Sequence, residues 1–331
     1  MIEKDFEFVL SKLHRNSLMG LAIVWVTLHH FALYSPTHSS VFTLFSQGSA
    51  GVDVFFFLSV FGLCYSYSAN GIREYYIRRI QRIFPMYFFF IAFWYLGCKM
   101  FHIPIDNIGR MIFNTLTCAS CVSNMSTGID IIEWYIPAQF FIYLIFPVMF
   151  IGMKKIASMR TYSLAVSFIS VVLSGLIISN YSSRPIFLRL PVIFIGMLTY
   201  FTINSVGGGK KLYLTIAISA IMTLFIPRIY ALSTSLIIPG LLICYNYIVS
   251  SIHDFSMVKS FTKHLDFLGR HTLEIYLAQA FSTQYYLKYS FGTNIIVAWS
   301  VTILLTVMVA IFLYYLQTLF YTSNLISCKK S

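Results

Sequence analysis

Residues 295–321, IIVAWSVTILLTVMVAIFLYYLQTLFY, decide the class of this protein, because they form a long apolar run without a charged residue. A helix of roughly 20 such residues is long enough to cross the hydrocarbon core of a bilayer. The whole chain has the same character: of 331 residues, 58% are hydrophobic, 18% aromatic and only 10% charged. Soluble domains carry about 25% charged residues. The composition therefore excludes a water-soluble globular protein.

Similar apolar segments recur along the chain, so we predict an all-α, polytopic membrane protein of about ten transmembrane helices. The predicted spans are residues 17–35, 51–69, 83–101, 133–152, 161–179, 186–204, 210–226, 229–249, 267–287 and 295–321. Residues 108–122 are apolar but shorter, and we interpret them as a re-entrant or interfacial segment. If they cross the bilayer, the count is eleven and the C-terminus changes side.

The net charge of +12 is explained by topology, because Lys and Arg resist translocation and gather in cytoplasmic segments. Most of the 23 Lys and Arg residues lie in the segments that ten spans place on one side together with the N-terminus. We therefore expect both termini in the cytoplasm, with residues 1–16 as a short cytoplasmic stretch, and we expect no nucleic-acid partner. The first span has no small-residue cleavage site, so it is not read as a signal peptide. Residues 1–331 are predicted to form a single membrane domain.

His30 and Asp53 are the first candidates for chemistry, since ionisable groups within the membrane are costly and often functional. His30 lies in the outer half of the first span, and Asp53 lies near the outer end of the second. A carboxylate that accepts a hydrogen bond from an imidazole fixes its tautomer and leaves the other nitrogen free as a base. A structural pair, or a histidine at the lipid headgroups, is the alternative interpretation.

A second candidate site is the arginine cluster of residues 75–87, YYIRRIQRIFPMY. Arg78 and Arg82 are four residues apart and share a helix face, with Arg79 beside them and Tyr87 further along. Guanidinium groups next to tyrosines suit phosphates and an adenine ring. The same cluster also satisfies the positive-inside rule and could bind anionic lipid.

Two further polar segments open predicted spans. Glu133, Trp134 and Gln139 lie at the outer end of the fourth span, where the tryptophan suits either an interface anchor or a sugar. Arg270 and Glu274 are four residues apart in the ninth span and are expected to neutralise one another. Cys118 and Cys121 form half of a zinc motif without a second pair, so we predict no metal site.

Taken in order, five segments resemble the motifs of the integral-membrane acyltransferase family 3. They are LMGLAIVWVTLHHF at 18–31, GVDVFFFLSVF at 51–61, RRIQRIFPMY at 78–87, WYIPAQFFIYLIFP at 134–147 and LGRHTLEIYLAQ at 268–279. The chain departs from the family at four positions. Met19 replaces an arginine, for which Arg15 could substitute, and Val60 replaces a glycine. Gln139 and Gln279 replace a glutamate and a histidine.

The resemblance implies an enzyme of bacterial plasma membranes that O-acylates sugars of surface polysaccharides or their lipid-linked precursors. Its donor is an acyl-CoA, usually acetyl-CoA, and no bound cofactor is expected. It implies that His30, oriented by Asp53, is catalytic and that Arg78, Arg79, Arg82, Tyr87 and Arg15 bind the donor. Glu133, Trp134 and Gln139 would lie on the acceptor side. A transporter or flippase of a lipid-linked glycan has the same composition and is the competing hypothesis.

Overall fold

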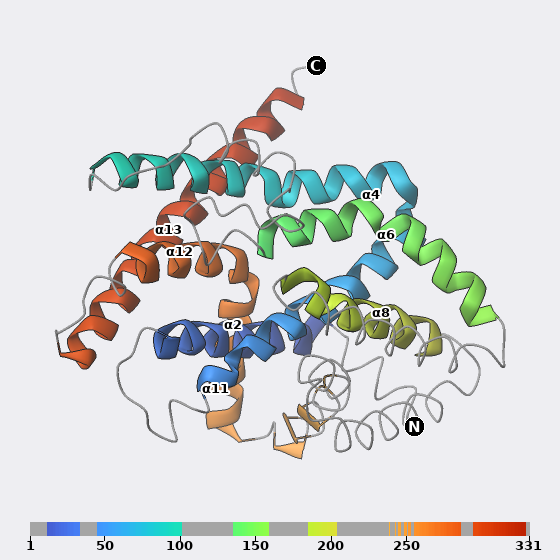
Figure 1. Cartoon of the computed structure of the whole chain (residues 1–331), viewed down its shortest axis with the longest axis horizontal. Helices are drawn as coiled ribbons and strands as arrows, with labels where there is room; N and C mark the ends of the chain where they lie inside the picture. The colour runs from blue at the N-terminus through green and yellow to red at the C-terminus, as the bar shows by residue number, and fades with distance from the viewer. Residues whose placement is uncertain are drawn as a thin grey trace. The chain divides into compact units, whose positions relative to one another are not determined.

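The computed structural model describes residues 12–33, 45–100, 135–158, 185–203, 255–285 and 294–328, with scattered positions between 238 and 252. This part of the chain is helical and contains no strand. Figure 1 shows its helices. They are α2 (Lys12–Leu33), α4 (Ala50–Met100), α6 (Tyr135–Ser158), α8 (Pro185–Ile203), α11 (Ser256–Arg270), α12 (Thr272–Tyr285) and α13 (Ile295–Cys328), with a 3-10 turn at Gln47–Ser49.

Four of the described helices are long and apolar enough to cross a membrane: Arg15–Leu33, Ala50–Met100, Tyr135–Lys155 and Ile295–Leu319. The all-α class is thus seen throughout the described residues, whereas the count of ten spans stays a prediction. The predicted spans at 161–179 and 210–226 and the segment 108–122 lie outside the described residues. Of the predicted span 229–249, only scattered positions are described.

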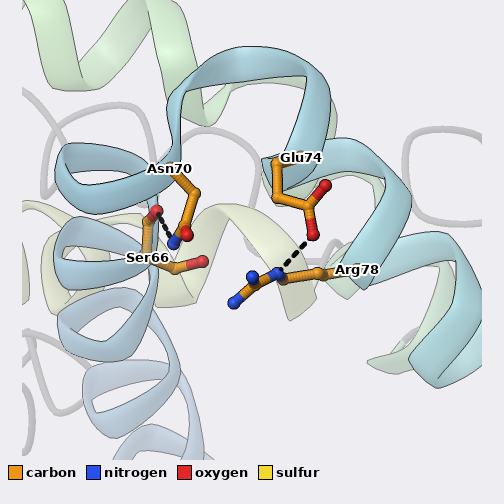
Figure 2. A network of polar contacts seen from close by, with 4 residues as sticks. All are labelled: Ser66, Asn70, Glu74 and Arg78. Atoms are coloured by element: carbon orange, nitrogen blue, oxygen red, sulfur yellow. Dashed lines mark hydrogen bonds and ion pairs between the residues drawn. The ribbon is translucent and has the colours of Figure 1, made fainter.

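The predicted second and third spans both lie within α4, in which two helices meet at a kink at Gly71. Residues 72–82 are helical, so the helix of the third span begins before the predicted residue 83, and the arginine cluster lies on it as expected. Gly71 has a φ of 74°, a left-handed conformation that glycine adopts without a steric penalty. Just before the bend, the Asn70 side chain donates a hydrogen bond of 2.9 Å to the carbonyl of Ser66 (Figure 2).

The predicted ninth span, residues 267–287, is not one helix. The chain turns at His271, which separates α11 from the 14-residue α12. The cytoplasmic loop expected at 250–266 is helical from Ser256 onward. Both expectations rested on average hydrophobicity, which is low in α11 because polar and apolar residues alternate around its axis.

The described chain packs into two compact units, each built from several segments. One unit contains residues 1–26, 48–71 and 144–270, and the other contains residues 27–47, 72–143 and 271–331. In the first unit, α11 packs on the start of α2 at two glycines. A Cβ on Gly20 would overlap the carbonyl oxygen of Leu265, and a Cβ on Gly269 would overlap that of Asn16. Only glycine permits backbones to approach this closely.

In the second unit, α12 and α13 pack along each other. Their contact is partly polar, since the hydroxyls of Ser282 and Thr306 lie 2.6 Å apart and both side chains are buried. Hydroxyl pairs of this kind join helices where no water can satisfy them. Phe31, near the end of α2, packs against Ala298 and Trp299 of α13. These contacts position the end of α2, which carries His30.

Candidate active site

His30 lies in the last turn of α2, next to the buried Phe31. The ring centroids of Phe31 and Trp299 are 5.3 Å apart, and this contact anchors the helix end. The rings of His29 and His30 are 5.6 Å apart and tilted by 51°. Because consecutive helix residues point about 100° apart, the two imidazoles face different surroundings.

Gln279 of α12 lies beside the His30 side chain and interacts with it electrostatically. It is fully buried, with an exposed fraction of 0%. Among the described residues, its two amide atoms and Nδ1 of His30 make no hydrogen bond. Buried polar groups are nearly always paired, so those that are not paired with protein groups mark a place for water or substrate. The pair thus brings a base and an amide together at one point.

Asp53 is engaged by a residue that the sequence analysis missed. Nη1 of Arg189, in α8, donates to Oδ2 of Asp53 at 2.5 Å, and the carboxylate is completely buried. Gly51 allows the start of α4 to approach α2, because a Cβ there would lie 2.8 Å from the carbonyl oxygen of Ala22. The signal for Arg189 was a charge within the apolar segment PIFLRLP at residues 185–191.

The expected contact between His30 and Asp53 stays a prediction. The two residues belong to different compact units, so the structure does not test it. What the structure adds is a neighbour for each, Gln279 for the imidazole and Arg189 for the carboxylate.

The three arginines of the cluster have different environments. The guanidinium of Arg79 lies 5.7 Å from the ring centroid of Tyr75 and 5.9 Å from that of Tyr143. We call these three residues the Arg79 cage. The hydroxyl of Tyr75 donates a 3.1 Å hydrogen bond to the carbonyl of Tyr143, which ties α4 to α6 and fixes the cage. Arg79 Nε is buried and makes no hydrogen bond within the described part of the chain.

Arg78 and Arg82 are both exposed, unlike Arg79. Arg78 pairs with Glu74 at 2.8 Å across one turn of α4, and its side chain is 52% exposed (Figure 2). An exposed pair of this kind contributes at most about 1 kcal/mol and is readily exchanged for another anion. The cluster therefore combines one guanidinium held between aromatic rings with two that are exposed to a ligand.

Buried tyrosines surround this cluster. The ring centroids of Tyr135 and Tyr276 are 4.8 Å apart, and Tyr135 interacts electrostatically with Arg82. Tyr87 is buried and interacts with Tyr276. Together they line the second unit with phenol groups contributed by α4, α6 and α12. Tyr87, which we predicted to bind the donor, is packed against Phe140 of α6, and its contact with a donor stays a prediction.

Gln139 of α6 is almost fully buried, at 3% exposed, and its amide atoms make no hydrogen bond among the described residues. Glu133 and Trp134, the other predicted acceptor-side residues, lie outside the described residues. Arg15 lies against α4, with its guanidinium 3.5 Å from the position that a Cβ of Gly62 would take.

The expected Arg270–Glu274 pair is not supported. The two residues lie in different helices, and Glu274 pairs instead with His271 at 3.7 Å. Within the described ranges, no group of three His, Cys, Asp or Glu side chains is placed to hold a metal ion.

Residues 16–316, which include all five motif segments, match the acyltransferase domain of acyltransferase family 3. The chain belongs to acyltransferase family 3. The resemblance drawn from the sequence motifs is thereby confirmed, and the protein is a membrane acyltransferase. No curated protein and no solved structure matches the chain.

This acyltransferase carries amides at two positions where the family motifs have titratable side chains. Gln279 and Gln139 are both buried, and an amide donates and accepts hydrogen bonds without changing charge. Neither can serve as a base or a nucleophile. Beside Gln279, His30 is a side chain that can move a proton.

Proposed function

We propose that this membrane acyltransferase transfers an acyl group, acetyl in the simplest case, from an acyl-CoA to a sugar hydroxyl. The acceptor would be a cell-surface polysaccharide or its lipid-linked precursor in a bacterial plasma membrane, with both termini of the enzyme in the cytoplasm. The family match over residues 16–316 carries the proposal, and it favours an enzyme over a flippase.

In the proposed reaction, His30 removes the proton of the acceptor hydroxyl. The oxygen then attacks the carbonyl carbon of the thioester, and the carbon–sulfur bond breaks. CoA leaves as a thiolate and receives the proton from the imidazolium. Gln279 is suited to hold the imidazole and to donate an N–H to the carbonyl oxygen as negative charge develops there.

The arginine cluster is the proposed donor site. Acyl-CoA carries phosphates and an adenine ring, and these groups suit forked guanidinium donors next to aromatic rings. The Arg79 cage supplies a guanidinium held between Tyr75 and Tyr143, while Arg78 and Arg82 are exposed and able to reach phosphates. Tyr87 and Arg15 remain proposed members of this site, and Glu133, Trp134 and Gln139 remain proposed acceptor-side residues.

The decisive experiment compares His30→Ala with His29→Ala in membranes at matched expression. Acyl transfer from labelled acetyl-CoA is measured, and surface glycans are examined by mass spectrometry for added acetyl. Loss of a general base lowers a rate by about 10²–10⁴-fold, so His30→Ala should be nearly inactive. His29→Ala should keep most activity. Full activity of His30→Ala in folded protein would disprove the catalytic role of this histidine.

A further inference from the structure

Among the described residues, helix α11 packs along one face. Leu265 and Gly269 are its buried residues, and they contact the start of α2 at Gly20 and Asn16. Figure 1 shows α11 running across α2 rather than alongside it. At 100° per residue, Leu265 and Gly269 lie within about 40° of each other, so most of the circumference of α11 faces away from α2.

A second face of α11 is exposed and mainly apolar, with the exposed His264 in the same row. Met257 is 82% exposed and Phe261 is 58% exposed, and both lie within about 40° of the half-buried Leu268 on the helical wheel. Phe267, 63% exposed, lies about 100° from the centre of this face and is not part of it. Large apolar side chains exposed in one row mark an interaction surface.

A third face is basic. Lys259, Lys263 and Arg270 are all exposed and lie within about 40° of one another. This row is about 160° from the centre of the apolar row, so charge and apolar surface occupy opposite sides of the helix. The acidic residue of α11, Asp266, is only partly exposed and interacts with Tyr245. The exposed charge is therefore positive.

The contact with α2 determines the depth of α11. The apolar span in α2 begins at Arg15, and α11 touches it at Asn16 and Gly20. At 1.5 Å rise per residue, these positions lie about 1.5 and 7.5 Å inside the end of the span. Amphipathic helices that lie in a membrane interface bury their apolar face by about 5–10 Å. The contact thus holds α11 at the boundary between headgroups and acyl chains.

We propose that α11 is an interfacial helix that binds the anionic lipid of the bilayer in which the protein is embedded. Met257 and Phe261 insert between the acyl chains, and Lys259 and Lys263 attract the negative headgroups. The two glycine contacts hold the helix at that level. The inference does not depend on the reaction that the enzyme catalyses.

The test is hydrogen exchange of the full chain in nanodiscs of phosphatidylcholine alone and of phosphatidylcholine mixed equally with phosphatidylglycerol. Amides of α11 should be more protected in the anionic discs. Each lysine near an anionic surface strengthens such binding about fivefold. Lys259→Gln with Lys263→Gln should therefore lower the protection of the α11 amides in anionic discs by up to about 30-fold. The matched control is Lys154→Gln with Lys155→Gln at the end of α6, where two exposed lysines lie outside α11.

Equal protection of α11 in the two lipid compositions would overturn the proposal, as would an equal effect of the control pair. The apolar face is tested separately with Phe261→Trp and brominated phosphatidylcholine. The fluorescence of the four native tryptophans, measured in the unsubstituted protein, is subtracted. Quenching of the added tryptophan is expected. Fluorescence that stays unquenched would show that the face lies in water or against another protein, and either result contradicts the assignment.

Discussion

The ion pair between Asp53 and Arg189 offers the sharpest test of the structure. It joins the first turn of α4 to α8, and its two residues are 136 positions apart in the chain. We predict that Arg189→Met strongly destabilises the protein. The neutral double variant with Asp53→Asn should recover much of that loss, because it leaves no buried charge without a partner.

The magnitude follows from burial. The Asp53 side chain is 0% exposed and that of Arg189 is 12% exposed, so removing the guanidinium leaves a carboxylate in an apolar interior. Breaking a buried pair from one side typically costs about 3–5 kcal/mol. The Glu74–Arg78 pair in Figure 2 is a matched control, because its side chains are 45% and 52% exposed. Removing Arg78 should cost less than about 1 kcal/mol.

The assay is unfolding of the purified protein in mixed micelles with increasing dodecyl sulfate, followed by circular dichroism. A double-mutant cycle over Asp53→Asn and Arg189→Met isolates the energy of the pair from the other contacts of each residue. A cost for Arg189→Met no larger than that for Arg78→Met would refute the reasoning, since the carboxylate would then not depend on this guanidinium.

The same double variant separates two roles of Asp53. If stability and acyl transfer both recover, Asp53 acts through Arg189 in holding α4 and α8 together. If stability recovers but transfer stays lost, Asp53 has a further role, and orientation of His30 is the proposed one. An amide at this position can stabilise the wrong imidazole tautomer, which explains how such a variant would fold and remain inactive.

Two other predictions concern the donor site and the packing of α11. Arg79→Ala should raise the KM for acetyl-CoA by about 10- to 150-fold, the value of a lost charge-assisted hydrogen bond. Arg78→Ala should raise the KM for acetyl-CoA by less than about fivefold if the charge of Arg78 acts at the surface. Equal increases in KM for Arg78→Ala and Arg79→Ala would contradict the special role of the Arg79 cage. Gly269→Ala should displace α11 and lower stability, because the added Cβ meets the carbonyl of Asn16. At Gly152, where a Cβ meets nothing within 4 Å, the same change should be neutral or stabilise by up to about 1 kcal/mol in the same unfolding assay.

Several features were predictable because they depend on local sequence. The apolar run at 17–35 corresponds to α2, and the run at 295–321 lies within α13. The ordered motifs predicted the family correctly. The break at His271 was not predictable from hydropathy, because no turn motif marks it. The helices on its two sides differ in what their faces contact.

The sequence by itself determined that this is a helical membrane acyltransferase, because apolar composition, run length and motif order are properties of the chain that need no partner. Only the tertiary structure decided that Arg189 neutralises Asp53, that Gln279 lies beside His30, and that Arg79 rather than Arg78 is held between tyrosines. Each of these depends on which helices pack together, and residues of different helices carry no local signal of their contact. The arginines illustrate the difference. Adjacent side chains of one helix have opposite environments once a neighbouring helix covers one of them.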